Sequence, residues 1–558
     1  MKNRSRSQLL IIGLLVVLGT PTLYSQEVSL NGQHRVTHHS RLSTSSTGHG
    51  YGKGGKPKPS PTPSADGESL WTGALTSDFN TTGNWTGVSG GHAPPIAGDV
   101  AWFPASPTTK SVNLSSSDNI SGLYFSETGS SGYTLSNSNS AALTLTAYGT
   151  TVGTELGNDT AVAIGANNST SSNTISAPLT LAPASGSVST IYQANGGELI
   201  ISGAISGSGI TLSKTGDGIL TLSGANDYSG GTTINAGTVK MSGSGTLGST
   251  SGTLTMNGGI LDLNGTNQSV GALNGSGGTI LNELPSGLNG PKTLTIGNGD
   301  TSGSFSGTIT DHDGSGSGFV KLVKVGTGTQ TMSSTTSNYT GGTDINNGVL
   351  ISNSSNGGAL GTGAITVNDS GTLAGSGKIA NNGLDAPITV NSGGTLMPGS
   401  TGSSGSYTTL QVGALTLNSG STFSVDINGG TTAAGTGAGS LYDQVNALGK
   451  ITLGGNLSLS LGSTALSIGD KFYIMTYTIG SGESGIFANT SNSGLTYTQG
   501  SDTFAVLYND ATVGGGLLSV SLQLTAIPEP RTYFAAALAM AALLITRRRQ
   551  LSRLLKRA

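Results

Sequence analysis

Few residues of this 558-residue chain have the types and spacing that chemistry needs, and the clearest group is the run from Asp311 to Gly316. Asp311 and Asp313 are two carboxylates at i and i+2 before a glycine, which can hold Ca²⁺ through oxygen ligands. The run lacks a downstream acidic ligand and does not match the nonapeptide calcium repeat. We favour a polar surface loop, and calcium binding by Asp311 and Asp313 stays open.

A second group that could bind a metal consists of His34, His38, His39 and His49. Imidazoles ligate transition metals, but no cysteine or carboxylate ligand set accompanies them here. Their surroundings are rich in proline, glycine and lysine, which favours an extended, solvated segment without a fold to fix geometry. Residues 26–68 are therefore predicted to be a disordered linker, and we assign no metal and no cofactor.

The sequence contains no convincing set of catalytic residues. Polysaccharide lyases and hydrolases need clustered carboxylates, usually with a basic residue nearby. The body of the chain offers only His92 and His312, has no arginine between residues 42 and 530, and contains no adjacent pair of aspartates. With no cysteine, thiolate chemistry and disulfides are excluded as well. We predict a protein that is not an enzyme and has no catalytic residues.

The charges are distributed unevenly. Residues 1–58 hold eight of the 24 basic residues and residues 531–558 hold seven, whereas all acidic residues except Glu27 lie between these ends, with Glu529 at their edge in the tripeptide Pro528-Glu529-Pro530. The body is therefore strongly acidic. Nucleic acids and anionic membrane surfaces require a cationic footprint, so we predict no nucleic-acid partner.

The elements that would position any site are short strands. Between residues 110 and 525, runs such as GILTLSG and GTLTMNGG alternate apolar with polar residues and are punctuated by glycine and asparagine. Period-two alternation between turn signals is the strand signature, and no sustained helical period interrupts it. The fold class predicted is all-β, a parallel β-solenoid that buries a few apolar side chains per coil, with ladders of Asn, Ser and Thr at its corners.

One internal repeat is visible, at residues 212–241 and 322–351, with Lys214 aligned to Lys324. Each copy is too small to bury its apolar face alone, so neighbouring units must stack. The K-x-G-x-G-x-x-T core, the Y-[ST]-G-G-T turn and the following I-N-x-G resemble the autotransporter-associated β-strand repeat. In the second copy, Gln330 stands where an aliphatic residue is expected. The resemblance implies a right-handed parallel β-helix.

Two segments are predicted to close the ends of a solenoid that occupies residues 110–409. Residues 69–109 contain all three tryptophans, and residues 410–525, rich in aromatics, resemble the end of an autotransporter passenger. Exposed tryptophans could stack on sugars. We favour an N-terminal cap in which Trp71, Trp85 and Trp102 cover the last apolar layer.

The start of the chain is typical of a secretory signal. A basic beginning is followed by an apolar run from Leu9 to Leu18 and by small and turn-forming residues, with cleavage expected after Ser25. Residues 1–25 are therefore predicted to be a signal peptide that engages the Sec translocon. An uncleaved N-terminal anchor is the alternative.

The carboxyl end carries three features in a fixed order. They are the tripeptide Pro528-Glu529-Pro530, an apolar run from Tyr533 to Ile545, and the basic cluster Arg547-Arg548-Arg549. The apolar run is shorter than the ~20 residues of a comfortable membrane span. The arginines would stay in the cytoplasm under the positive-inside rule and stop transfer of the chain.

This order is similar to the PEP-CTERM sorting signal of Gram-negative bacteria, here at residues 527–550 and followed by a basic cytoplasmic tail at 551–558. The resemblance implies recognition by an exosortase-type membrane protease, cleavage near the tripeptide, and transfer to the cell surface or the exopolysaccharide matrix. A transient inner-membrane anchor would precede that step. The alternative is a plain C-terminal anchor that is never cut.

An autotransporter would continue into a translocating barrel, and only about thirty residues follow Leu524. We therefore expect the tail to supply the route to the surface. The predicted function is that of a structural or adhesive β-solenoid at the surface or in the extracellular matrix, associated with exopolysaccharide. A polysaccharide-active enzyme on the same scaffold is one alternative, and an adhesin for a protein partner is another. The ligand and the oligomeric state stay open.

Overall fold

The structure is a computed structural model. It describes residues 67–88, 90–107, 109–126, 131–147, 162–168, 170–194, 196–284, 290–314, 316–379, 386–399, 407–429, 437–478, 480–527 and 540–548. The chain divides into two compact units, Met1–Pro59 and Ser60–Ala558, and every described residue belongs to the second. The predicted signal peptide, and the linker up to residue 66, lie outside the described residues.

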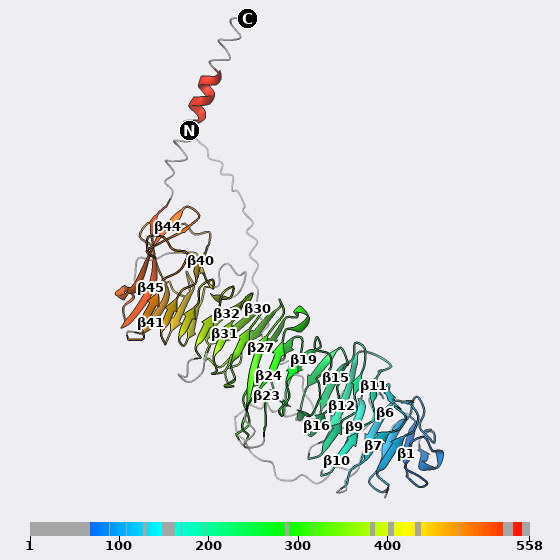
Figure 1. Ribbon diagram of the computed structural model, residues 1–558. Helices are drawn as coiled ribbons and strands as arrows, with labels where there is room; N and C mark the ends of the chain where they lie inside the picture. Colours follow the sequence, from blue (N-terminus) through cyan, green and yellow to red (C-terminus); the bar gives the residue numbers. More distant parts are fainter. Residues whose placement is uncertain are drawn as a thin grey trace, which may run out of the picture. The chain divides into compact units, whose positions relative to one another are not determined.

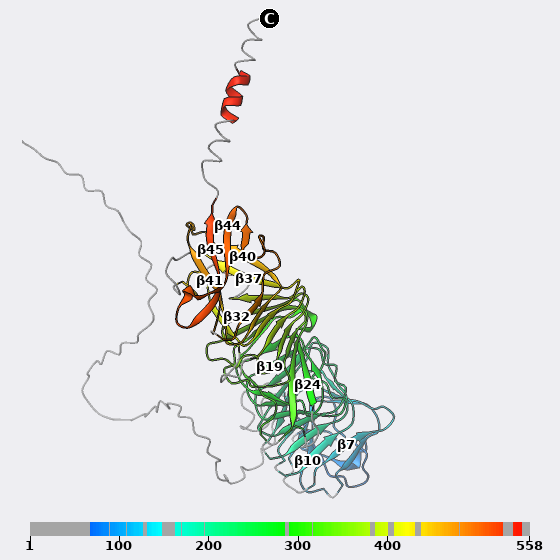
Figure 2. The same ribbon diagram turned by 60° about the vertical axis from the view of Figure 1, so that its left-hand side comes forward.

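The described chain is almost entirely β-structure, in sheets whose strands stack side by side and, away from the two ends, follow one another in the order of the coils (Figures 1 and 2). Sheet A has the order β2 (Trp85–Val88), β1 (Glu68–Trp71), β3 (Val100–Phe103), β6 (Gly122–Phe125), β9 (Val162–Ala166), β12 (Val188–Gln193), β15 (Thr211–Thr215), β17 (Gly231–Ile234), β19 (Thr253–Met256), β22 (Leu273–Asn274). Sheet B has the order β26 (Thr308–Ile309), β23 (Thr279–Leu281), β20 (Ile260–Asp262), β18 (Thr238–Met241), β16 (Ile219–Leu222), β13 (Glu198–Ile201), β10 (Ser172–Ile175), β7 (Thr134–Asn137), β4 (Ser111–Leu114).

A third side of the coil carries sheet C and then sheet D. Sheet C consists of β14 (Ile205–Ser206), β11 (Leu179–Leu181), β8 (Leu143–Leu145) and β5 (Asp118–Ile120). Sheet D consists of β21 (Gln268–Ser269), β24 (Gly290–Ile296), β27 (Gly318–Lys324), β29 (Thr343–Ile345), β31 (Ile365–Val367), β33 (Ile388–Val390), β36 (Leu415–Leu417), β39 (Ile451–Leu453) and β42 (Glu483–Gly485).

Sheet E takes over beside the end of sheet A, where β22 contacts β25. Its main path is β25 (Gly303–Phe305), β28 (Thr329–Met332), β30 (Gly348–Ser354), β32 (Gly371–Lys378), β35 (Thr409–Val412), β38 (Gln444–Ala447), β41 (Lys471–Thr478), β45 (Leu517–Ala526), β44 (Asp502–Asp510), β43 (Thr496–Gln499). A branch adds β34 (Thr395–Pro398), β37 (Thr422–Ile427) and β40 (Asn456–Leu461). Three short 3₁₀ turns are described, at η1 (Thr82–Asn84), η2 (Asn298–Asp300) and η3 (Ala511–Val513).

Parallel pairing in register builds the core from the alternating pattern. In sheet B, Leu199 lies opposite Leu220, which lies opposite Val239, and Val239 lies opposite Leu261. All four side chains are fully buried, so each coil adds one apolar layer to a continuous core. Burying a side chain of this size contributes about 1.5–3 kcal/mol, which explains how such short strands remain paired. The predicted all-β, parallel solenoid is confirmed in this coarse form.

The two ends differ from the parallel stack. At the N-terminal end, β2 pairs antiparallel with β1, and Trp85 meets Trp71 edge to face at 5.0 Å between ring centroids. Both rings are buried, whereas Trp102 lies half-buried against Tyr124. At the C-terminal end, β41, β45, β44 and β43 pair antiparallel. Antiparallel strands cannot extend the coil, so they terminate it.

The predicted sorting segment is described only at residues 540–548, which form an exposed helix. Among the described residues, no helix has both the length and the apolar character that crossing a bilayer requires. Pro528, Glu529, Pro530 and Arg549 lie outside the described residues. Their predicted roles, and those of Arg547 and Arg548 in that helix, stay predictions.

Candidate functional site

Asp311 is a structural carboxylate rather than an open ligand. It is 9% exposed and accepts hydrogen bonds from the Val320 amide (2.9 Å), the Thr340 amide (3.1 Å) and the Thr340 hydroxyl (2.6 Å). Asp313 is exposed, and its amide donates to the Glu283 carboxylate at 3.2 Å. Within the described ranges, no three His, Cys, Asp or Glu side chains converge on a possible metal position.

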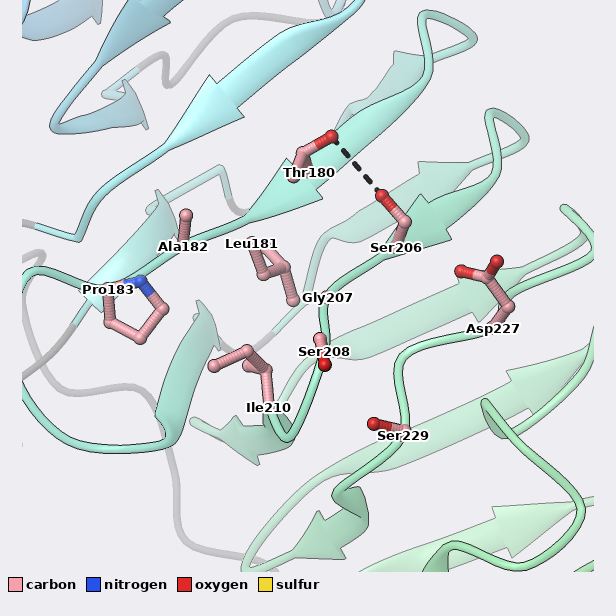
Figure 3. A pocket seen from close by; sticks show the side chains of 10 residues that line it. All are labelled: Thr180, Leu181, Ala182, Pro183, Ser206, Gly207, Ser208, Ile210, Asp227 and Ser229. Carbon is pink, nitrogen blue, oxygen red and sulfur yellow. Dashed lines mark hydrogen bonds between the residues drawn. The ribbon is translucent and has the colours of Figure 1, made fainter.

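A groove of the described solenoid lies on the third side of the coil, at the end of sheet C. Its volume is about 670 Å³. Its lining residues are Thr180, Leu181, Ala182, Pro183, Ser206, Gly207, Ser208, Ile210, Asp227 and Ser229. Figure 3 shows that they come from three consecutive coils.

The groove exists because the third side of the coil has no strand at this point. Sheet C ends at β14, and sheet D begins at β21. Between these strands the chain crosses the third side without a strand, although its backbone stays tied to the coil before it. The Asp227 amide donates to the Ile205 carbonyl and the Ser229 amide donates to the Gly207 carbonyl, both at 3.0 Å.

These bonds align two short rows of side chains across the three coils. The first row is Thr180, Ser206 and Asp227, in which the Thr180 and Ser206 hydroxyls are 3.2 Å apart. The Asp227 side chain is exposed, and no donor from the described part of the chain reaches its carboxylate. Two residues further on, the second row contains Ser229, whose hydroxyl accepts the Gly209 amide at 2.7 Å.

The side of the groove away from Asp227 is apolar. Leu181 is 2% exposed and Ile210 is 8% exposed, and Pro183 lies beside them (Figure 3). Among the described residues that line the groove, Asp227 is the only carboxylate. The arrangement can therefore accept and donate hydrogen bonds along one side and exclude water along the other, but it does not offer two carboxylates for acid–base chemistry.

The repeated lysines form the second built feature. Lys214 is 0% exposed, and its ammonium donates to the carbonyls of Thr215 (2.9 Å), Gly216 (2.6 Å) and Ala236 (3.3 Å). Lys324 in the second copy does the same with Val325 (2.7 Å), Gly326 (2.8 Å) and Asn347 (3.2 Å). Three acceptors match the three donors of an ammonium, so each lysine ties two successive coils together at a corner.

Burial is the main influence on these ammonium groups. It lowers the pKa of Lys214 and of Lys324 to about 8, against a smaller opposing effect of Asp217 on Lys214 and of Asp300 on Lys324. Both lysines therefore remain mostly charged at neutral pH. The tyrosines of the repeat are equally buried, with hydroxyl contacts from Tyr228 to Thr232 and from Tyr339 to Thr343 at 2.7 Å each.

The two segments that form this recurring corner match a known family of repeats. Residues 212–241 and 322–351 match the Passenger-associated-transport-repeat family. The part of the predicted recognition that concerns autotransporter-associated repeats is thereby confirmed. A further match joins 127 residues, or 22% of this chain, to the Adhesin BmaC autotransporter of Brucella suis biovar 1 (strain 1330) at 35% identity. That match covers 3% of the adhesin, so the similarity concerns a short stretch of a far longer protein.

The backbone of Leu273 explains the anomalous Gln330 of the second repeat. Gln330 is 1% exposed, and its amide group pairs with the backbone of Leu273, donating to the carbonyl at 2.8 Å and accepting the amide at 3.2 Å. A buried glutamine is tolerated because both ends of its amide are satisfied. Sequence patterns predict an aliphatic residue there, and only the position of Leu273 beside the strand reveals why a polar one fits.

Corner ladders of asparagine, which the composition predicts, run from the second repeat onward. The Asn368 side-chain amide donates to the Asn346 side-chain oxygen at 2.8 Å, and Asn391 and Asn418 continue the ladder at 2.9 Å per step. Each step links one coil to the next. The groove residues Asp227 and Ser229 were not singled out from the sequence, because a single carboxylate among serines carries no motif.

Proposed function

We propose that this protein is an exported, surface-exposed β-solenoid whose role is structural and adhesive rather than catalytic. The observation that carries the proposal is the pair of passenger-associated repeats, whose buried lysines and tyrosines lock successive coils into a long stack. The match to part of an autotransporter adhesin supports placement at the surface of a Gram-negative bacterium.

Adhesion by such a body would rest on many weak contacts. On sheet D, Thr366, Thr389, Thr416 and Thr452 lie opposite one another in register, on the face opposite the buried residues of their strands. Adjacent strands are about 4.7–4.9 Å apart, so the hydroxyls recur at the scale of a sugar unit. Repeated weak hydrogen bonds of this kind raise avidity without any strong single site. We infer that the partner is exopolysaccharide.

Delivery would depend on the two ends of the chain. In this proposal residues 1–25 direct the chain to the Sec translocon, and an exosortase-type protease recognises Pro528-Glu529-Pro530 while Arg547, Arg548 and Arg549 hold the tail on the cytoplasmic side. The short apolar run and the positive cluster support that order. The sorting step concerns how the body reaches the surface and is separable from what the body binds.

A polysaccharide-active enzyme is the second candidate that the same scaffold could support. Glycosidic cleavage uses two carboxyl groups on either side of the bond, about 5–10 Å apart. The groove has one carboxylate among its described lining residues, which favours binding over cleavage.

The test is to follow the full-length protein and a variant lacking residues 528–558 in the native host. We expect the full-length protein on protease-accessible cell surfaces or in the matrix, with a mature carboxyl terminus near Pro530 by mass spectrometry. The deletion variant should appear in the medium or the periplasm. Recovery of intact peptides between Ala535 and Arg547 from surface protein would refute the sorting step. Retention of the body in the cytoplasm would refute the function as a whole.

A further inference from the structure

The groove at the end of sheet C is open to solvent, and the second copy of the repeat shows what closes the same corner. The second copy has the same corner, with Asn338 in place of Asp227 and Thr340 in place of Ser229. There Thr340 donates to the Asp311 carboxylate, so the loop that carries Asp311 occupies the corner. In the first copy the corner stays open beside β14.

The backbone around both corners is fixed in the same way, which makes the open one preformed. The Asn226 side chain accepts the Ile205 amide at 2.9 Å in the first copy, and the Ser337 hydroxyl accepts the Ile309 amide at 2.9 Å in the second. Asn226 also donates to the Thr246 carbonyl at 2.8 Å. The segment that presents Asp227 is therefore held at both sides, and a ligand would not have to order it.

The chemistry of the walls selects a ligand class. Thr180 and Ser206 hydroxyls can each donate or accept, and the Asp227 carboxylate is a free acceptor in line with them. Such a row suits a ligand with several adjacent hydroxyl donors. Opposite the row, the exposed Ala182 and the half-buried Pro183 offer an apolar surface to the C–H face of a ring, with Leu181 and Ile210 buried behind them. A volume of about 670 Å³ lies in the range of ligand sites, roughly 300–1,000 Å³.

The charge of the groove narrows the class of ligand further. Asp227 is negative, and no cation is found among the described residues that line the groove. A carboxylated or sulfated sugar would face repulsion there, whereas a neutral sugar would not and an amino sugar would be attracted. We propose that this groove is a saccharide-binding site that takes a neutral or amino sugar residue of a glycan, with Asp227 accepting from its hydroxyl or ammonium groups. The proposal rests on the proposed adhesive function and names the kind of sugar that one site would contact.

The experiment measures saccharide binding by the purified full-length chain. An array of neutral, amino and acidic oligosaccharides is screened first, and the best neutral or amino ligand is then titrated by calorimetry. Asp227→Ala should weaken binding by about tenfold or more, because a hydrogen bond to a charged group is lost. Thr180→Val should weaken it by a few fold while keeping the strand shape.

Two matched variants control for general effects. Asn338→Ala changes the equivalent position in the second repeat, and Asp369→Ala removes an exposed carboxylate outside the groove. Both should bind like the unmodified protein. A rise in affinity at low salt for amino sugars only, lost in Asp227→Ala, would distinguish an ammonium contact from a hydroxyl contact.

The groove proposal is overturned if no neutral or amino saccharide binds, if Asp227→Ala binds unchanged, or if acidic saccharides bind best. Circular dichroism of each variant separates loss of binding from loss of fold. Failure of the groove can be told from failure of the proposed function, since surface location and polysaccharide retention are scored in cells. A protein found at the surface that binds no saccharide at the groove refutes only the groove.

Discussion

The buried lysine of the first passenger-associated repeat gives the most informative perturbation. Lys214→Met keeps the length and apolar stem of the side chain but removes the ammonium that reaches three carbonyls. The Gly216 and Ala236 carbonyls have no second donor among the described residues, so they would be left unpaired in a closed corner. The change therefore tests whether the corner depends on that charge.

The magnitude follows from two opposing contributions. Leaving a buried acceptor unsatisfied costs about 1–3 kcal/mol, so the two carbonyls without a second donor cost roughly 4 kcal/mol in all. Against this, burial has lowered the pKa of Lys214 to about 8 from 10.5, and removing that buried charge returns about 3 kcal/mol. We expect a net loss of about 1 kcal/mol in the free energy of unfolding.

Hydrogen exchange measured by mass spectrometry suits a stacked fold, because coils contact mainly their neighbours and open locally. Peptides within 212–241 should exchange faster in Lys214→Met, while peptides within 322–351 serve as the internal reference. Lys240→Met makes the same change at a half-buried position of β18 and should cost less than about 0.5 kcal/mol. Equal exchange in the two repeats of Lys214→Met would refute the reasoning.

The pH dependence of hydrogen exchange tests the same prediction independently. The pKa of Lys214 is depressed in the folded protein, so the unfolded chain binds more protons between pH 8 and 10.5. Stability of this corner should therefore rise as pH increases through that window. Lys214→Met should lose the rise at the first repeat and keep it at the second, where Lys324 has the same depression. A fall in protection across that window would contradict the assignment.

Three further outcomes are expected. Asp311→Asn should destabilise the loop by about 1–2 kcal/mol, because the amide cannot replace a charged acceptor for three donors. In the unmodified protein, where these donors already occupy Asp311, the melting temperature should be the same in calcium and in EDTA. Tyr339→Phe should cost about 1 kcal/mol in urea unfolding through its lost contact with Thr343. Burial alone would raise the pKa of Asp510, yet hydrogen bonds, chiefly from Lys471, hold that pKa at about 2. The contribution of Asp510 to the free energy of unfolding is therefore present above pH 3.8 and is lost as pH falls towards 2. Exchange of peptides from β44 and β45 should report that loss, and Asp510→Asn should flatten it.

How far the sequence predicts this structure depends on what alternation encodes. Period-two patterns mark which side chains face inward, so the stack of Leu199, Leu220 and Val239 follows from the sequence. The pattern does not say on which coil a third strand is lost, because that depends on turn geometry between strands. The antiparallel end around β45 was missed for a related reason: its strands alternate like parallel ones.

Single polar residues were harder to place than apolar rows. Lysine is usually a surface residue, so the sequence alone would place Lys214 on the surface. Only the recurrence of a lysine at Lys324 indicates that this position of the repeat is buried. Gln330 gives no such signal, since its partner Leu273 is 57 residues away in the chain. Long-range backbone partners decide whether a polar side chain can be buried, and local sequence does not contain them.

The groove shows how a repeat can generate a site that the repeat itself does not encode. Both copies place an aromatic hydroxyl and a lysine in the same buried positions, which fixes the corner but leaves its outer surface free to vary. Whether that corner is open depends on the neighbouring coil, which brings Asp311 over one copy and ends sheet C beside the other. A solenoid built this way can change its ligand through one coil without disturbing the stack. Transplanting the loop that carries Asp311 onto the coil before the first repeat should therefore abolish saccharide binding and leave the lysine corner of Lys214 intact.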